Sequence, residues 1–177
     1  MHNRISLPTA LVLAGVLALA GCSSGSEGSR SEIYGSLDAL IADSRAVVEV
    51  EVEGRDSVEG SDGVSPYTAA TAVVVAVFQP AELGQTAADG SMTVDPGSTI
   101  VVRQMGHPGM QNDTPYLELD GRYLLFLTPT GLRNASPNEF YVTGGVAGIY
   151  KAEGDGFIRL SRDEDDIPEM LTLNDLK

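Results

Sequence analysis

The sequence predicts a small, mainly β domain, either a barrel or a sandwich, and three observations support this prediction. Short runs rich in Val, Ile, Leu and Tyr recur along the chain, separated by clusters of Gly, Pro and Asp. Helical periodicity is confined to a few residues near each end of the folded region. The length of 177 residues suits one domain, and no internal repeat is visible. Five to seven strands with few helices imply that the strands pack on one another around a core.

The folded region is expected to begin with a short helix and two strands. Ser36 is a good N-cap for a two-turn helix over residues 36–42. Residues 45–53 alternate valine with glutamate, which predicts a strand with one buried face and one wet face. Residues 67–78 contain an unbroken apolar run, so we expect a central strand that is buried on both faces.

The second half of the chain predicts further strands and a second short helix. Apolar runs bounded by Gly and Pro predict single strands at 98–105, 122–127 and 139–143. A hairpin of 148–152 and 156–160 is expected around the Gly154 turn, because glycine supplies the positive φ that such a turn needs. Pro168 suits a first helical turn, so a short C-terminal helix is expected over residues 166–171.

The N-terminal residues have the pattern of a processing signal. One arginine precedes residues 5–20, which carry no charge and are mostly Leu, Val and Ala. The next residues, Leu19-Ala20-Gly21-Cys22, resemble the bacterial lipobox, in which the Cys thiol receives a diacylglyceryl group before cleavage. This resemblance implies a lipoprotein signal peptide at 1–21 and acylation of Cys22, palmitate being a typical chain. The Gly- and Ser-rich residues 22–35 then read as a flexible tether, followed by a single β-barrel domain over 36–177.

Acylation at Cys22 would decide where the protein lies. Two or three acyl chains, at about 0.8 kcal/mol per buried methylene, hold a protein firmly on a bilayer. We therefore expect a lipid-anchored protein on the extracytoplasmic side of the cell membrane, with the bilayer as one partner. Cys22 is the only cysteine, so the folded part has no disulfide.

The charge balance argues against nucleic acid as a partner. The chain has 25 acidic and 11 basic side chains, a formal net charge of −14. Nucleic-acid binding depends on clustered Lys and Arg, whereas the basic residues here are scattered and only two are lysine.

The order of the expected strands resembles that of a known kind of bacterial domain. The segments LELDGRYLLFL at 117–127 and GGVAGIY at 144–150 follow the apolar strands described above. This succession resembles uncharacterised exported lipoprotein domains of bacteria. It is more distantly similar to the netrin-like OB barrel of the tissue inhibitors of metalloproteinases. The resemblance implies an OB-like barrel, closed or partly open, and no activity. The inhibitors' zinc-chelating mechanism needs a free N-terminal Cys held by disulfides, so an acylated Cys22 cannot reproduce it.

One loop could hold a soft metal ion. Met105, His107 and Met110 lie in a single turn-rich segment, and thioether and imidazole groups suit Cu(I). The alternative interpretation is that the methionines fill gaps at the mouth of the barrel. We expect no tight metal site and no cofactor, and keep these residues as candidates for an alternative, metal-handling function.

Tyrosines could instead form a ligand-binding face. Tyr116, Tyr123, Tyr141 and Tyr150 would line one side of a barrel if their strands were neighbours, and OB barrels bind ligands by stacking on aromatic rings. The alternative is that they are core and rim residues.

The function expected from these observations is a non-enzymatic binding module of the cell envelope, anchored to the membrane and directed at a protein or a glycan. We expect no catalytic residues, because no Gly-x-Ser-x-Gly elbow occurs and cleavage before Cys22 leaves one histidine. The alternatives are a copper-handling lipoprotein and an envelope hydrolase with an unrecognised site.

Overall fold

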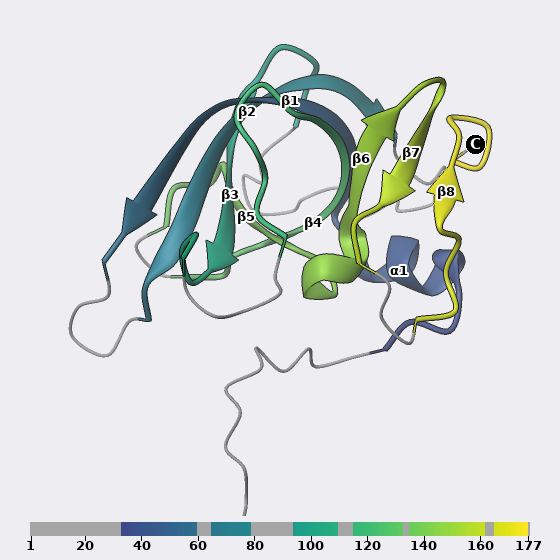
Figure 1. Cartoon of the computed structure of the whole chain (residues 1–177), viewed down its shortest axis with the longest axis horizontal. Helices are drawn as coiled ribbons and strands as arrows, with labels where there is room; N and C mark the ends of the chain where they lie inside the picture. Colours follow the sequence, from purple (N-terminus) through teal and green to yellow (C-terminus); the bar gives the residue numbers. More distant parts are fainter. Residues whose placement is uncertain are drawn as a thin grey trace, which may run out of the picture.

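The computed structural model describes residues 33–59, 65–78, 94–109, 115–132, 135–161 and 165–176. The structure is mainly β, with 48% strand and 10% helix, and a single α-helix lies beside one eight-stranded sheet (Figure 1). The elements in chain order are α1 (Leu37–Asp43), β1 (Ala46–Val58), β2 (Tyr67–Phe78), β3 (Thr99–Met105), β4 (Arg122–Pro129), β5 (Glu139–Val142), the 3-10 turn η1 (Gly145–Gly148), β6 (Ile149–Glu153), β7 (Gly156–Arg159) and β8 (Met170–Leu171).

Five of the strands form a ring of hydrogen-bonded neighbours. The order around it is β1-β2-β3-β5-β4, and β4 pairs back with β1. The β3–β5 pair is parallel, whereas the other pairs in the ring are antiparallel. The register of β1 against β2 shifts between Glu49 and Val50 and again between Val52 and Gly54. Such bulges bend a strand, and Figure 1 shows that β1 and β2 are strongly curved.

Alternate residues of each strand fill the interior of the ring. In β1, Val48, Val50 and Val52 are fully buried, while Glu51 and Glu53 are exposed, as the Val–Glu alternation predicts. Glu49 departs from the alternation, since it is 5% exposed and accepts from the Arg122 guanidinium at 2.6 Å. The same period of two directs one face of each neighbouring strand inward. The buried core of the ring consists of Ala46, Val48, Val50, Val52, Ala70, Ala72, Val74, Ile100, Val102, Leu117, Tyr123, Leu125, Leu127, Phe140, Val142 and Ile149.

A second core lies outside the ring, between β4, β6–β8 and α1. Phe126 of β4 and Tyr150 of β6 are both fully buried there, with ring centroids 5.8 Å apart and planes inclined by 53°. Leu40 of α1, Phe157 of β7 and Leu171 of β8 complete the contact. β4 is therefore buried on both faces, which explains its unbroken apolar run from Tyr123 to Leu127.

The segment 115–121 crosses one end of the ring and inserts Leu117 into its core. The side chain of Gln104 holds this segment, because its Oε1 atom accepts from the Leu117 N–H and its Nε2 atom donates to the Pro115 carbonyl, each at 2.9 Å. The Tyr123 hydroxyl accepts from the Glu118 N–H at 3.0 Å. The segment LELDGRY thus has a structural role, because it covers one end of the ring and leads into β4.

The predicted N-terminal helix is confirmed, and so are the strands and the hairpin, with small changes in their bounds. The expected burial of residues 67–78 on both faces is wrong, because the second core covers β4 and leaves alternate residues of β2 partly or largely exposed. The Ser36 hydroxyl caps α1 by accepting from the Ala39 N–H at 3.2 Å. The upper limit of seven strands was too low, because the sheet has eight.

The predicted C-terminal helix over 166–171 is wrong. The backbone groups that would make helical hydrogen bonds are bonded to other elements instead. The Asp166 N–H donates to the Tyr34 carbonyl, and the Glu169 carbonyl accepts from the Arg159 N–H. The Pro168 carbonyl accepts from the Tyr150 hydroxyl. Met170 and Leu171 then pair with β7 as β8.

The packed part of the chain includes Tyr34, which the sequence analysis places in the tether. This side chain is only 4% exposed and belongs to the second core. Its N–H donates to the Asp165 carboxylate at 2.8 Å, and its hydroxyl donates to Asp43 at 3.1 Å. The expected domain boundary at residue 36 therefore lies inside the folded structure.

Candidate functional site

The outer surface of β2, β3 and β5 carries the most varied set of side chains on the ring. Odd-numbered residues of these strands point outward, because their even-numbered neighbours fill the core. The strand pairing places them in one array: Tyr67 lies opposite Met105, and Arg103 lies between Ala69 and Tyr141. We call this array the outer face; it consists of Tyr67, Ala69, Thr71, Val73, Val75, Thr99, Val101, Arg103, Met105, Glu139 and Tyr141.

Arg103 is the centre of the outer face. Its guanidinium carbon lies 4.0 Å from the centroid of the Tyr67 ring, and its Nη2 atom donates to the Tyr67 hydroxyl at 2.6 Å. Its Nε atom lies 3.0 Å from the Oε2 atom of Glu139. Both side chains of this ion pair are largely buried, 14% and 19% exposed. The guanidinium is thus held in place by an aromatic ring on one strand and a carboxylate on another.

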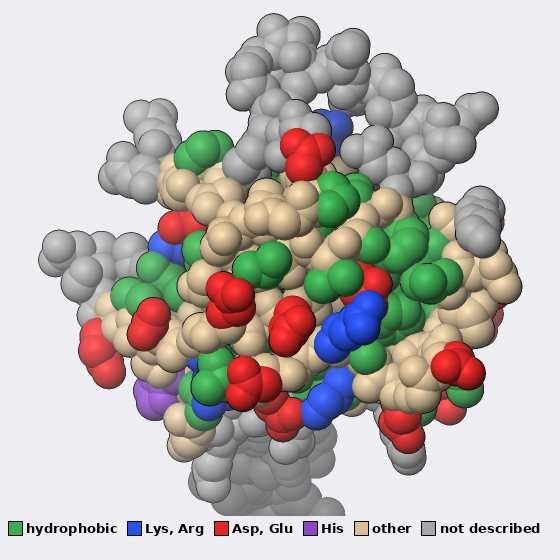
Figure 2. Space-filling model, turned by 90° about the horizontal axis from the view of Figure 1, so that it is seen from above, with side chains coloured by type: hydrophobic (Ala, Val, Ile, Leu, Met, Phe, Trp, Pro, Cys, Tyr) green, Lys and Arg blue, Asp and Glu red, His purple; other side chains and the backbone are tan. Residues whose placement is uncertain are grey.

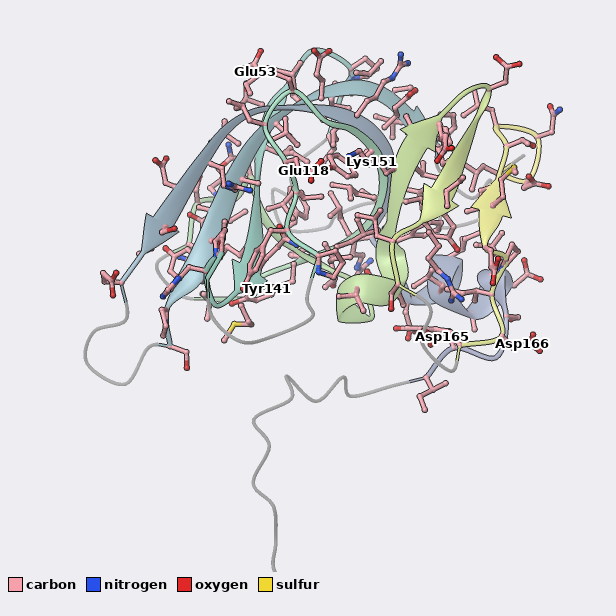
Figure 3. The ribbon with its side chains drawn as sticks, in the orientation of Figure 1. Glu53, Glu118, Tyr141, Lys151, Asp165 and Asp166 are labelled. Carbon is pink, nitrogen blue, oxygen red and sulfur yellow. The ribbon has the colours of Figure 1, made fainter. Side chains whose placement is uncertain are left out.

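The residues around this fixed charge leave apolar surface open to solvent. Met105 is 54% exposed and Tyr141 is partly exposed beside Arg103, whereas Val75, 40% exposed, lies toward the far end of β2, beyond its pairing with β3. Figure 3 labels Tyr141 on the β3–β5 side of the ring. Apolar contacts around a preset polar group are what a binding surface needs, because the polar group fixes the orientation of a ligand.

A second charged pair lies where segment 115–121 meets β6. Lys151 donates to the Glu118 carboxylate at 2.5 Å, and the two side chains are 43% and 63% exposed. The hydrogen bond from Lys151 lowers the pKa of the Glu118 carboxyl and raises that of the lysine. Figure 3 labels the two residues close to each other in the middle of the view, below the arch of β1 and β2. The pair fastens the closing segment to β6, and its exposure makes it a weak contributor to stability.

Of the three candidate copper ligands, the structure describes Met105 and His107. Met105 ends β3 on the outer face, and His107 lies in the following turn, with its Nδ1 atom 3.2 Å from the Pro108 carbonyl. Met110 lies outside the described residues. Gly106 and Gly109 have positive φ, 79° and 100°, and hydrogen bonds of Gly106 to Pro66 and Thr68 fasten the turn to β2. No group of three or more His, Cys, Asp or Glu side chains placed to hold a metal occurs among the described residues.

The four tyrosines proposed as one aromatic face do not share one. Tyr123 is fully buried inside the ring, and Tyr150 is fully buried in the second core. Tyr116 is partly exposed and donates from its hydroxyl to the Met105 carbonyl at 3.0 Å. Only Tyr141 belongs to the outer face, where the aromatic neighbour is Tyr67, a residue that the sequence analysis did not single out.

The outer face could be recognised only in part from the sequence. The period of two within each predicted strand indicates which residues share a strand face. Nothing in the sequence shows that β3 pairs with β5 in parallel, and this pairing brings Glu139 to Arg103 across 36 residues.

The lipobox residues Leu19, Ala20 and Gly21 and the lipidation candidate Cys22 lie outside the described residues. No helix in the described ranges is long and apolar enough to cross a membrane. The sequence matches no protein-family model and no curated protein. The geometry of the chain itself therefore has to support any functional argument.

Proposed function

We propose that the chain is a lipid-anchored, non-enzymatic binding module of the bacterial cell envelope and that the outer face is its binding surface. Cys22 carries the acyl chains on the extracytoplasmic side of the membrane. Residues beyond the signal peptide connect this anchor to the folded domain. The partner is a protein or a glycan of the envelope.

The ring of five strands is, in this proposal, an OB-like barrel. Its order β1-β2-β3-β5-β4, closed by the β1–β4 pair, supports this assignment, because the OB fold is a five-stranded Greek-key barrel. In that fold the strand 2 and strand 3 surface is a common ligand-binding surface. The corresponding strands here form most of the outer face.

The single observation that carries the proposal is Arg103, fixed between Tyr67 and Glu139 among exposed apolar side chains. A protein partner fits this surface better than a glycan, because the Arg103 guanidinium covers the Tyr67 ring and leaves Tyr141 as the available aromatic surface. An ordered arginine beside aromatic and methionine side chains is typical of protein interfaces.

Acyl labelling tests the anchor. Cells that express the wild-type chain and are fed an alkyne-labelled palmitate should yield a labelled protein in the membrane fraction. The variant Cys22→Ala should take up no label and should leave that fraction. A Cys22→Ala protein that stays as membrane-bound as the wild type would reject the lipoprotein assignment.

Co-purification tests the binding surface. The full chain should retain an envelope protein that Met105→Asp loses, because a buried, unpaired carboxylate at the interface opposes binding. Leu132→Asp is the matched control, since Leu132 is also exposed, 47%, and lies outside the outer face. Equal retention by the two variants would contradict the proposed surface.

A further inference from the structure

The strands β6, β7 and β8 extend the sheet beyond the ring and have two unlike faces. One face packs on α1 through Tyr150, Phe157 and Leu171, which are at most 5% exposed. The other face is covered in part, because Ile149 and Leu160 pack against the ring core and Lys151 is bound by Glu118. Its outer part, around Ile158 and Met170, is open to solvent among the described residues. Seen from above, apolar side chains gather on the right of the molecule, where β6–β8 lie in Figure 1 (Figure 2).

Lys151, Ile158 and Met170 form a row across this second face. They are direct neighbours in the register, Lys151 opposite Ile158 and Ile158 opposite Met170. Met170 is 58% exposed and Ile158 is partly exposed. Met170 also lies over Gly156, where an added Cβ would come within 3.7 Å of its side chain. Ile158 and Met170 are thus the apolar part of this row, and neighbouring apolar side chains open to solvent on a sheet face are a feature that marks interaction surfaces.

The border of this row is acidic. Glu153 and Asp155 lie at the β6–β7 turn and Glu169 precedes β8; all three are exposed, and none forms an ion pair with a described residue. The nearby cations are already engaged, Lys151 by the Glu118 carboxylate and Arg55 by the Leu117 carbonyl. Arg159 lies on the buried face, 3.8 Å from Asp165. Among the residues that the structure describes, the border therefore presents uncompensated negative charge.

The negative charge of this border limits which partners can bind the face of β6–β8. A second copy of the chain would bring two acidic borders together and would itself carry a net charge of −14. A membrane surface with anionic lipids is repelled in the same way. A segment of a protein partner with apolar side chains between Lys or Arg residues satisfies both the apolar row and its border.

We propose that the open face of β6–β8 docks a cationic, apolar segment of a protein partner. This site is separate from the outer face, because it lies on strands outside the ring. It does not depend on the proposed function, since it rests on the register of β6–β8 and the charges around them.

A displayed peptide library tests the proposal. The full chain in nanodiscs of phosphatidylcholine is panned with random 12-residue peptides, and empty nanodiscs remove the lipid binders. The enriched peptides should carry two or more Lys or Arg residues beside apolar ones. Their Kd, measured by fluorescence anisotropy, should rise at least tenfold with Met170→Glu and should also rise with salt concentration.

Leu132→Glu is the matched control and should leave the Kd within twofold of the wild type. Both substituted side chains are exposed, so both variants should keep the wild-type Tm. Enrichment of neutral or acidic peptides, no enrichment, or equal effects of the two variants would overturn the proposal. If sedimentation showed a dimer that Met170→Glu dissociates, the face would belong to a contact between two copies of the chain. That result would also overturn the proposal.

Discussion

The Oε1 atom of Gln104 accepts a hydrogen bond from the backbone N–H of Leu117, and this buried contact of 2.9 Å ties segment 115–121 to β3. The same side chain donates to the Pro115 carbonyl. The side-chain amide of Gln104 therefore satisfies two backbone groups of segment 115–121, which covers one end of the ring. This contact explains how a segment without regular secondary structure keeps Leu117 fully buried.

Replacing Gln104 by leucine should therefore destabilise the protein. The Leu117 N–H would lose its partner in a buried place, at a cost of about 1–3 kcal/mol. Denaturant unfolding should show this loss, and hydrogen exchange of the Leu117 amide should accelerate. The exposed neighbour Met105 provides the control, since Met105→Ala should change the free energy of unfolding by less than about 0.5 kcal/mol. Unchanged exchange at Leu117 in Gln104→Leu would contradict this role.

Gly121 should tolerate no side chain. A Cβ at this position would lie 2.5 Å from Cε2 of Tyr123 and 2.9 Å from the Glu118 carbonyl oxygen. Tyr123 is fully buried, so it cannot move aside at low cost, and Gly121→Ala should lower the free energy of unfolding by about 1–3 kcal/mol.

Gly54→Ala is the comparison for this glycine, because the nearest atom to its added Cβ is 3.6 Å away. Its effect should stay below about 1 kcal/mol. Similar melting temperatures for the two alanine variants would show that the close contact with Tyr123 does not destabilise Gly121→Ala.

Tyr34 should contribute to stability although it precedes the first helix. Its ring packs against Gly144, where an added Cβ would lie 2.5 Å from the ring. Tyr34→Ala should cost about 3–5 kcal/mol, as for other buried aromatic side chains, whereas Tyr34→Phe removes one hydrogen bond and should cost about 0.5–1.5 kcal/mol. Ile33→Ala, at a side chain 58% exposed, is the control. A Tyr34→Ala protein as stable as this control would place residue 34 outside the folded structure.

Stability should decline at alkaline pH through Tyr150. Burial raises the pKa of the Tyr150 hydroxyl to about 12, with Asp165 adding to the effect and Arg159 opposing it. The unfolded chain releases this proton near pH 10, so the contribution of Tyr150 is complete below about pH 10 and is lost as the pH rises through about 12. The ionised form can no longer donate to the Pro168 carbonyl.

The check is urea unfolding from pH 8 to pH 12 for the wild type and for Tyr150→Phe. The variant should be less stable below pH 10, because it lacks the hydrogen bond, and its free energy of unfolding should fall less steeply above pH 10. If the free energies of unfolding of the two proteins changed in parallel across this pH range, Tyr150 would be excluded as the source of the alkaline loss of stability.

The sequence predicts β1 well because one face of this strand is apolar. Val48, Val50 and Val52 alternate with glutamates, and this pattern depends only on the chain near them. The C-terminal helix was predicted wrongly because Pro168 and its acidic neighbours favour a helical turn locally, whereas Tyr34 and Arg159 capture the backbone groups from distant positions. Such long-range partners are invisible to local patterns.

The candidate site depends even more on long-range pairing. Tyr67, Arg103 and Glu139 come from three strands, and each has an ordinary strand context in the sequence. The chemistry of the site arises only when the antiparallel β2–β3 pair and the parallel β3–β5 pair meet. A motif search finds unusual residues such as Met105 and His107 but cannot find a common face.

The most direct test of the proposed binding module is photo-cross-linking in living cells. A benzophenone amino acid is placed at position 105, on the outer face, or at position 132, outside it. The proposal predicts a discrete cross-linked product with one envelope partner from position 105 after irradiation and none from position 132. No product from position 105, or the same products from both positions, would contradict it.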